Sequence, residues 1–115
     1  MSDDKTLDDP LKDLKKRRSI TRAAVTRLLA VLEGKSFLYA SSVTETERDE
    51  MGGILSSLCT KRDQLGVLDD DVTVLLRDED IECDVEISTT YSLKLNTAIA
   101  AVSYTHLTLP TILLV

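Results

Sequence analysis

The first residues able to do chemistry form a basic run near the start of a chain whose formal net charge is −6. On a helix, Lys15, Arg18 and Arg22 share one face, a spacing suited to contacts with the phosphates of a nucleic acid. No aromatic residue interrupts the run, so base stacking is not expected. The alternative is a solvated face that pairs with the acidic third helix. The candidate nucleic-acid contacts are Lys12, Lys15, Lys16, Arg17, Arg18 and Arg22.

Carboxylates and thiols do not form a recognisable catalytic or metal site in the sequence. Asp69–Asp71 and Asp78–Glu82 lack the glycine and glutamate positions of a calcium loop, and we interpret them as helix caps and turns. The single histidine, His106, is far along the chain from Cys59 and Cys83, which argues against zinc and against a Cys–His nucleophile. We therefore expect no enzyme, no cofactor, no metal and no small-molecule substrate.

The composition indicates one folded, helical domain. The 115 residues are 43% hydrophobic, 30% charged and only 3% aromatic, which excludes a core built on aromatic rings. Four glycines and two prolines are too few for a turn-rich β-fold. No apolar run approaches the roughly 18 residues of a membrane span, and no signal peptide is expected. Two isolated cysteines favour a cytoplasmic location. Lys15–Arg18 allows for nuclear import as well.

Amphipathic helices must position these residues, and the first is expected over residues 10–33. Apolar residues recur there at spacings of three and four. Pro10 follows two aspartates, and Gly34 follows the last leucine turn, which are favourable start and stop signals. The preceding residues 1–9 are acidic and polar, so we expect them to be disordered.

The second helix is expected over residues 44–76. Thr44 and Glu47 have the spacing of a capping box. Two rows of residues at intervals of seven run along the segment, with Lys61 as their only polar member. Gly52 and Gly53 predict a break or bend near the start, because each glycine costs roughly 1 kcal/mol in a helix interior.

The third helix is expected over residues 79–101, after a tight turn at Arg77–Asp78. A row spaced by seven runs from Ile81 to Val102. Branched residues around Val85 also allow a strand, but the continuous row favours a helix. The fold predicted is all-α, either a three-helix antiparallel bundle or a long helical hairpin with a flanking N-terminal helix. The seam between helices is expected at Met51, Ile54, Leu58, Leu65, Leu68, Val72, Leu75, Ile81, Val85, Leu95 and Ile99.

The last residues, 102–115, contain no charged side chain and differ in character from the rest. Val102–Thr111 resembles the translation of a transposase mosaic-end adapter used in sequencing libraries. We therefore expect a non-native, irregular tail from Val102 onward, and a natural protein that continues beyond Ala101 with another sequence. His106 then has no functional meaning. The alternative is a short C-terminal strand, which would lack a partner strand.

One family resemblance covers residues 11–101. Its motifs are the basic start Leu14–Ser19, Val25–Leu29, the leucine-rich end Leu65–Leu68, the acidic segment Asp78–Glu86 and Tyr91–Leu95. Together they resemble the N-terminal helical, Gag-like region of BEL/Pao retrotransposon polyproteins of invertebrates. Gly52–Gly53 departs from that pattern. The protease, polymerase and zinc-knuckle signatures of such polyproteins do not occur here. The resemblance implies a non-enzymatic segment that associates with itself or with other polyprotein segments, with RNA as a further partner. No membrane partner is expected, because no apolar run is long enough to span one.

Overall fold

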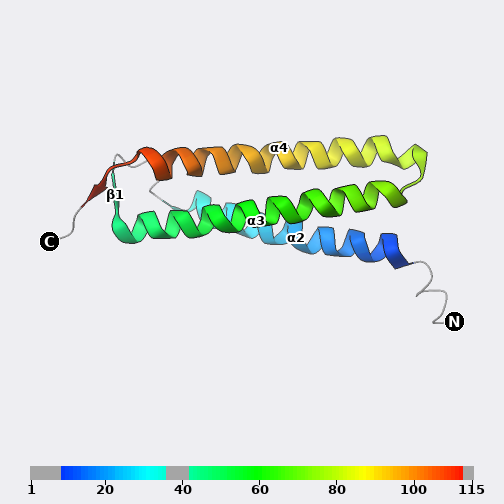
Figure 1. The fold of residues 1–115 in the computed structure, drawn as a ribbon, viewed down its shortest axis with the longest axis horizontal. Coiled ribbons are helices and arrows are strands. Elements are labelled where there is room, and N and C mark those ends of the chain that lie inside the picture. Colours follow the sequence, from blue (N-terminus) through cyan, green and yellow to red (C-terminus); the bar gives the residue numbers. More distant parts are fainter. Residues whose placement is uncertain (1–8, 36–41, 113–115) are drawn as a thin grey trace.

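The computed structural model describes residues 9–35 and 42–112 as three long helices and one pair of two-residue strands. The helices are α2 (Asp9–Glu33), α3 (Glu45–Leu75) and α4 (Asp78–Thr108). Each runs antiparallel to the one before it, as Figure 1 shows. The predicted all-α, three-helix antiparallel bundle is therefore confirmed. The predicted disordered N-terminus falls on residues 1–8, outside the described residues, while Asp9 already begins α2.

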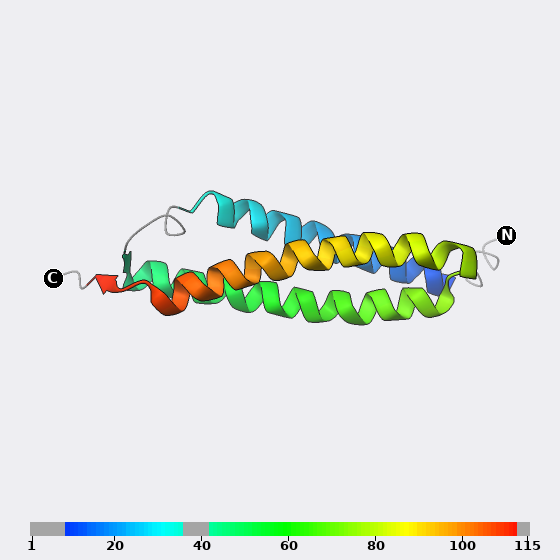
Figure 2. The same ribbon diagram turned by 90° about the horizontal axis from the view of Figure 1, so that it is seen from above.

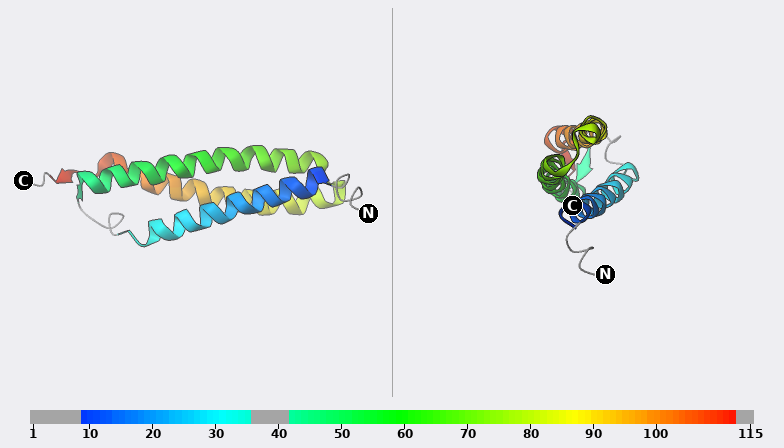
Figure 3. Two further views of the ribbon diagram at one scale, coloured as in Figure 1. Left: turned by 90° about the horizontal axis from the view of Figure 1, so that it is seen from below. Right: turned by 90° about the vertical axis from the view of Figure 1, so that its right-hand side faces the viewer.

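The bundle is elongated because the helices lie side by side along their length. Its extents are 66 × 29 × 19 Å and its radius of gyration is 18.3 Å. A compact domain of this size would have a radius of gyration of about 13 Å. Seen from above, α2 is inclined to the α3–α4 pair (Figure 2). Seen end-on, the three helices occupy the corners of a triangle (Figure 3).

The start of α3 carries the predicted capping box. The Glu47 backbone N–H donates to the Thr44 hydroxyl over 3.1 Å, and the Thr44 backbone N–H donates to the Glu47 carboxylate over 2.9 Å. These two bonds satisfy backbone donors that the first helical turn leaves unpaired. The capping prediction is therefore confirmed, and the helix begins at Glu45.

The predicted break at the paired glycines does not occur, because α3 is continuous from Glu45 to Leu75. Met51 and Ile54, on either side of the pair, are both buried. Packing of these neighbours outweighs the weak helix propensity of Gly52 and Gly53. Gly52 also faces α4, where an added Cβ would lie 3.5 Å from His106 Nε2, an ordinary van der Waals distance.

A two-residue link reverses the chain between α3 and α4, as predicted. The Leu76 N–H donates to the carbonyl oxygens of Val72 and Thr73, which closes the end of α3. Arg77 is extended and lies at the N-cap position of α4. The first turn of α4 carries three acidic residues, Asp78–Asp80, which the positive end of the helix dipole stabilises.

The C-terminal segment corrects the prediction of an irregular tail from Val102. Helix α4 continues to Thr108, with Val102 and Thr105 buried. Val102 completes the row of seven-residue intervals, so it faces the same interior as Leu95. Pro110 then removes a backbone donor and disfavours helix at the residue before it.

The short strand that follows α4 does have a partner, contrary to expectation. β2 (Thr111–Ile112) pairs in parallel with β1 (Val43–Thr44), and Val43 lies opposite Thr111. The Val43 N–H also donates to the Pro110 carbonyl over 3.0 Å. The pair therefore joins the end of α4 to the start of α3 (Figure 1).

The apolar core is concentrated in the half of the bundle nearest the strand pair. No residue from Asp78 to Lys94 is fully buried. Among the predicted seam positions, Leu68 and Ile81 are half-buried, whereas Leu75 and Val85 are 43% and 44% exposed. In the other half Val72 of α3 is fully buried, whereas α4 is held there by polar contacts. The buried apolar residues are Val25, Leu32, Val43, Met51, Ile54, Leu58, Leu65, Val72, Leu95, Ile99 and Val102.

Candidate functional site

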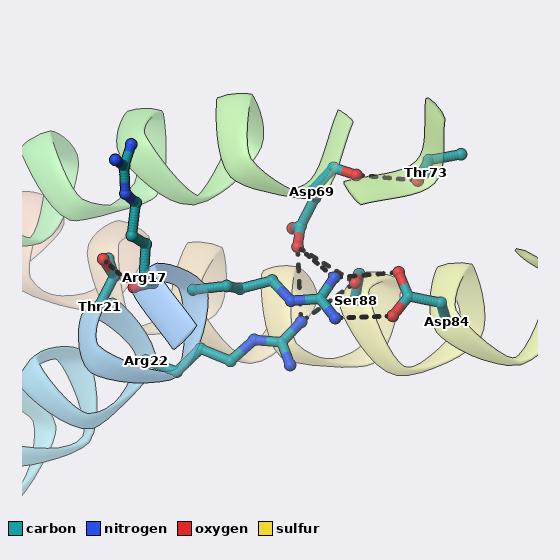
Figure 4. Close-up of polar contacts among 8 residues, drawn as sticks. Arg17, Thr21, Arg22, Asp69, Thr73, Asp84 and Ser88 are labelled. Atoms are coloured by element: carbon teal, nitrogen blue, oxygen red, sulfur yellow. Dashed lines mark hydrogen bonds and ion pairs between the residues drawn. The ribbon is translucent and has the colours of Figure 1, made fainter. Parts of the chain in front are cut away.

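The polar half of the bundle is organised around Arg18, whose side chain is only 8% exposed. Its guanidinium donates to both carboxylate oxygens of Asp84, over 2.7 and 3.0 Å. The same group donates to Asp69 over 3.3 Å. One side chain of α2 thus binds α3 and α4 together, and Figure 4 shows Asp69 and Asp84 approaching from these two helices.

Arg22, one turn further along α2, extends the network. Its guanidinium lies 3.5 Å from Asp69 and donates to the Ser88 hydroxyl over 3.1 Å. It also lies over the Tyr91 ring, 5.3 Å from the ring centre, a cation–π arrangement. The Tyr91 hydroxyl donates to the Arg22 backbone carbonyl over 2.8 Å. Ser88 donates in turn to Asp69 over 3.3 Å, which closes the cluster.

The four charged groups of this cluster balance, with two arginines and two aspartates. Hydrogen bonds from Arg18 lower the pKa of Asp84 below its ordinary value, and the charge of Arg18 adds to this effect. The bond to Asp84 raises the pKa of Arg18. Asp84 therefore stays ionised and both its oxygens accept from one guanidinium. A carboxylate occupied in this way can hold helices in register, but it is poorly placed to act as a general base.

The position of Arg18 and Arg22 corrects their assignment as nucleic-acid contacts. They lie on the α2 face that also carries the buried Val25 and Leu32, at spacings of three, four and seven. Both arginines therefore point into the bundle. Arg18 does pair with the acidic third helix, through Asp84, as the alternative expected, but from the interior and not from a solvated face. Arg18 and Arg22 lie seven and three residues before Val25, so the helical spacing could have assigned them to the buried face from the sequence alone.

The remaining basic candidates lie on the outside of α2. Lys12, Lys15 and Lys16 are exposed. Arg17 is also exposed, and it forms an ion pair with Asp13 over 3.0 Å, one turn earlier. The structure thus divides the predicted run into an inner pair of arginines and an outer set of four cations.

The other residues with reactive side chains are dispersed. Cys59 is half-buried on α3 and Cys83 is exposed on α4, and both are free thiols. Asp70 and Asp71 are exposed, unlike their neighbour Asp69. Within residues 9–35 and 42–112, no three histidine, cysteine, aspartate or glutamate side chains gather closely enough to hold a metal ion.

Two open grooves run along the bundle surface. One, of about 530 Å³, lies between α2 and α3 and contains Ile20, Val67 and Leu68. Ile20 is 59% exposed and Val67 is 61% exposed, although both are large and apolar. The other, of about 480 Å³, lies between α3 and α4 and includes Val85 and Leu93. Ile20 and Val67 thus expose apolar surface in the first groove, and Val85 and Leu93 in the second.

Comparison with known proteins does not assign this chain to a family. No protein-family model matches its sequence, and no curated protein or solved structure matches it either. Among the described helices, none combines the length and apolar character needed to cross a membrane.

Proposed function

We propose that this chain is a non-enzymatic helical module that associates with copies of itself or with other segments of a polyprotein. The observation that supports this most directly is the open α2–α3 groove, where Ile20 and Val67 expose more than half of their surface. Apolar side chains gathered in one groove favour association, because burying them removes apolar surface from water.

A non-enzymatic role is further supported by the interior polar groups. The Asp84 carboxylate accepts two hydrogen bonds from Arg18, and Asp69 accepts from Arg18, Arg22 and Ser88. These contacts use the acidic and basic groups to join helices. They leave the acid and base committed to each other rather than directed at a ligand.

Sedimentation equilibrium over a range of concentrations tests the proposal. The expected result is an apparent mass that rises between about 10 μM and 1 mM, the range in which weak complexes form. A mass that stays at the monomer value up to about 1 mM would exclude functional self-association of this segment.

The family proposed for the module is the Gag-like region of a retrotransposon polyprotein. Support comes from the resemblance of Leu14–Ser19, Leu65–Leu68 and Asp78–Glu86 to that region. The flanking genomic sequence tests this origin. Protease and polymerase frames downstream are expected, and their replacement by an unrelated coding frame would contradict it. A cytoplasmic location, with nuclear import through Lys15–Arg18, belongs to the same proposal.

A second candidate function is nucleic-acid binding by the outer face of α2. It is favoured by the exposure of Lys12, Lys15 and Lys16 within two turns of one helix. Neutralising all three to glutamine should abolish binding to single-stranded RNA. Three phosphate contacts predict a logarithmic salt slope of about −2 between about 50 and 200 mM salt. An RNA affinity that does not depend on salt, or that the triple substitution leaves unchanged, would rule this function out.

A further inference from the structure

We propose that the α2–α3 groove is the surface through which two copies of this chain pair, with α2 of each copy lying over α3 of the other. This inference rests on the self-association proposed above and names its surface and its arrangement. It is carried by the apolar groove and by the charges that flank it.

The apolar residues of α2 and α3 in the groove lie at the same height along the bundle. Ile20 on α2 and Val67 on α3 line the same groove, together with Leu68. Helical spacing places Val31 on the Ile20 side of α2 and Val74 on the Val67 side of α3. These two valines are 49% and 80% exposed, so the outer side of each helix carries exposed apolar side chains between its charged ones.

The net charges on these outer sides of the two helices have opposite signs. On α2, Lys16 and Arg27 lie one and two turns from Ile20 on the same side, and both are exposed. On α3, Asp63 and Asp71 lie one turn on either side of Val67, and both are exposed. Asp13, seven residues before Ile20, lies on the same side of α2 and pairs with Arg17, so the α2 edge is basic on balance and the α3 edge is acidic.

Two-fold symmetry then decides how a second copy can bind. A two-fold axis parallel to the groove places α2 of one copy over α3 of the other at the same level, so basic edges meet acidic edges. An axis across the groove would place α2 over α2 and α3 over α3, so that charges of the same sign would face each other. Charge complementarity therefore selects the axis along the groove.

The size of the face sets the strength expected of the pair. Two adjacent helices over four turns present a patch of roughly 400 Å² in projection. Stable complexes bury about 800 Å² on each partner, so the pair should be weak and form at high concentration. This is why the association has to be measured toward millimolar protein.

A substitution in the groove tests the surface. Val67→Glu places a charge at the centre of the face and should weaken the dimer at least about tenfold. Leu93→Glu is the matched control, because Leu93 is 67% exposed but lies in the α3–α4 groove. Circular dichroism of both variants verifies that each keeps its helices. Val67→Glu with unchanged association would overturn the inference.

Charge reversal tests the arrangement with side chains that are all exposed. One variant carries Lys16→Glu and Arg27→Glu, and the other carries Asp63→Lys and Asp71→Lys. Each alone should associate more weakly than the parent, since like charges then face each other at both edges. An equimolar mixture should restore association, because the acidic α2 of the first variant then meets the basic α3 of the second, and the basic α2 of the second meets the acidic α3 of the first. Failure of the mixture to restore it would contradict the arrangement.

The outcomes separate this inference from the proposal on which it rests. If the parent chain stays monomeric, self-association itself is wrong. If the parent associates but neither Val67→Glu nor the charge reversals weaken it, self-association stands and the pairing surface lies elsewhere. A parent dimer that strengthens with added salt would indicate the axis across the groove, on which like charges face each other. That result would also overturn the inference.

Discussion

Arg18 and Asp84 are 66 positions apart in the sequence, yet the guanidinium of one donates to both carboxylate oxygens of the other. The pair links α2 to α4, two helices not joined by a direct connection. Because Arg18 also donates to Asp69, the same side chain joins all three helices. The stability of the polar half of the bundle should therefore depend on this pair.

Replacing Asp84 with asparagine should destabilise the protein by about 3 kcal/mol, because it leaves the buried Arg18 charge without its main partner. Urea unfolding followed by circular dichroism measures the change. Asp70→Asn is the matched control, since Asp70 is exposed, and should lie within about 0.5 kcal/mol of the parent. Equal changes in unfolding free energy for the two substitutions would show that the Arg18–Asp84 pair contributes no more to stability than an exposed aspartate does.

The lowered pKa of Asp84 predicts a loss of stability in acid. A carboxyl whose folded pKa lies below its unfolded pKa stabilises the fold above the unfolded value, about pH 3.9, and this contribution is lost as pH falls through the folded value. The groups facing Asp84 are Arg18, Arg22 and Lys15 on α2, with Asp69 of α3 sharing Arg18.

The measurement compares the unfolding free energies of the parent and of Asp84→Asn from about pH 7 to about pH 2.5. Their difference should shrink below about pH 4, because protonation makes the parent resemble the variant. Two curves that remain parallel through this range would show that Asp84 does not titrate with folding. The raised pKa of Arg18 acts only far above neutral pH and leaves this window unaffected.

Gly53→Ala should stabilise the protein by about 0.5–1 kcal/mol. The site is inside the continuous α3 helix, and an added Cβ would meet no heavy atom within 4 Å. Thermal unfolding measures the gain. Gly52→Ala is a useful comparison, because its Cβ would touch the His106 side chain at an ordinary distance. Destabilisation by Gly53→Ala would instead support a break in the helix at the paired glycines.

Packing of the C-terminal helical turns can be tested by placing a charge in them. Val102 is fully buried, so Val102→Asp should destabilise by about 3 kcal/mol or more. Leu107 is 76% exposed, and Leu107→Asp should change stability by less than about 0.5 kcal/mol. Similar, small effects of both would mean that this segment does not pack on α3.

The resemblance of Val102–Thr111 to a translated sequencing adapter can be tested by an adapter-free genomic or transcript read across Ala101. We expect such a read to continue with a different sequence. A read that encodes Tyr104–Thr111 would show that the segment belongs to the protein. The helix described for this segment bears on how these residues pack and not on their origin.

The fold was predictable where the signals for an element lie within a few residues of one another in the sequence. The Thr44–Glu47 spacing, the turn at Arg77 and the seven-residue rows are features of neighbouring residues, and the structure contains the corresponding capping box, turn and helices. The break expected at Gly52 was wrong, because burial of flanking residues on a partner helix outweighs propensity. Such partners cannot be identified within one segment.

The polar cluster was harder to predict because charge was taken as a sign of exposure. Arg18 and Arg22 belong to a basic run of six candidate residues, and their residue type does not separate them from the other four. Only the continuation of the Val25 face back through polar positions distinguishes the inner arginines from the outer lysines. Their partners, Asp69 and Asp84, are remote in the sequence and have no local signal.

The uneven distribution of the core has a consequence for how the molecule opens. Residues Asp78–Lys94 include none that is fully buried, and this part of α4 is bound through ion pairs and hydrogen bonds. Added salt weakens such contacts, whereas it leaves the apolar half largely unaffected. Amide hydrogen exchange should therefore be fastest beside the Arg77 turn and slowest near Leu58 and Leu95, with a gradient that steepens as salt is added.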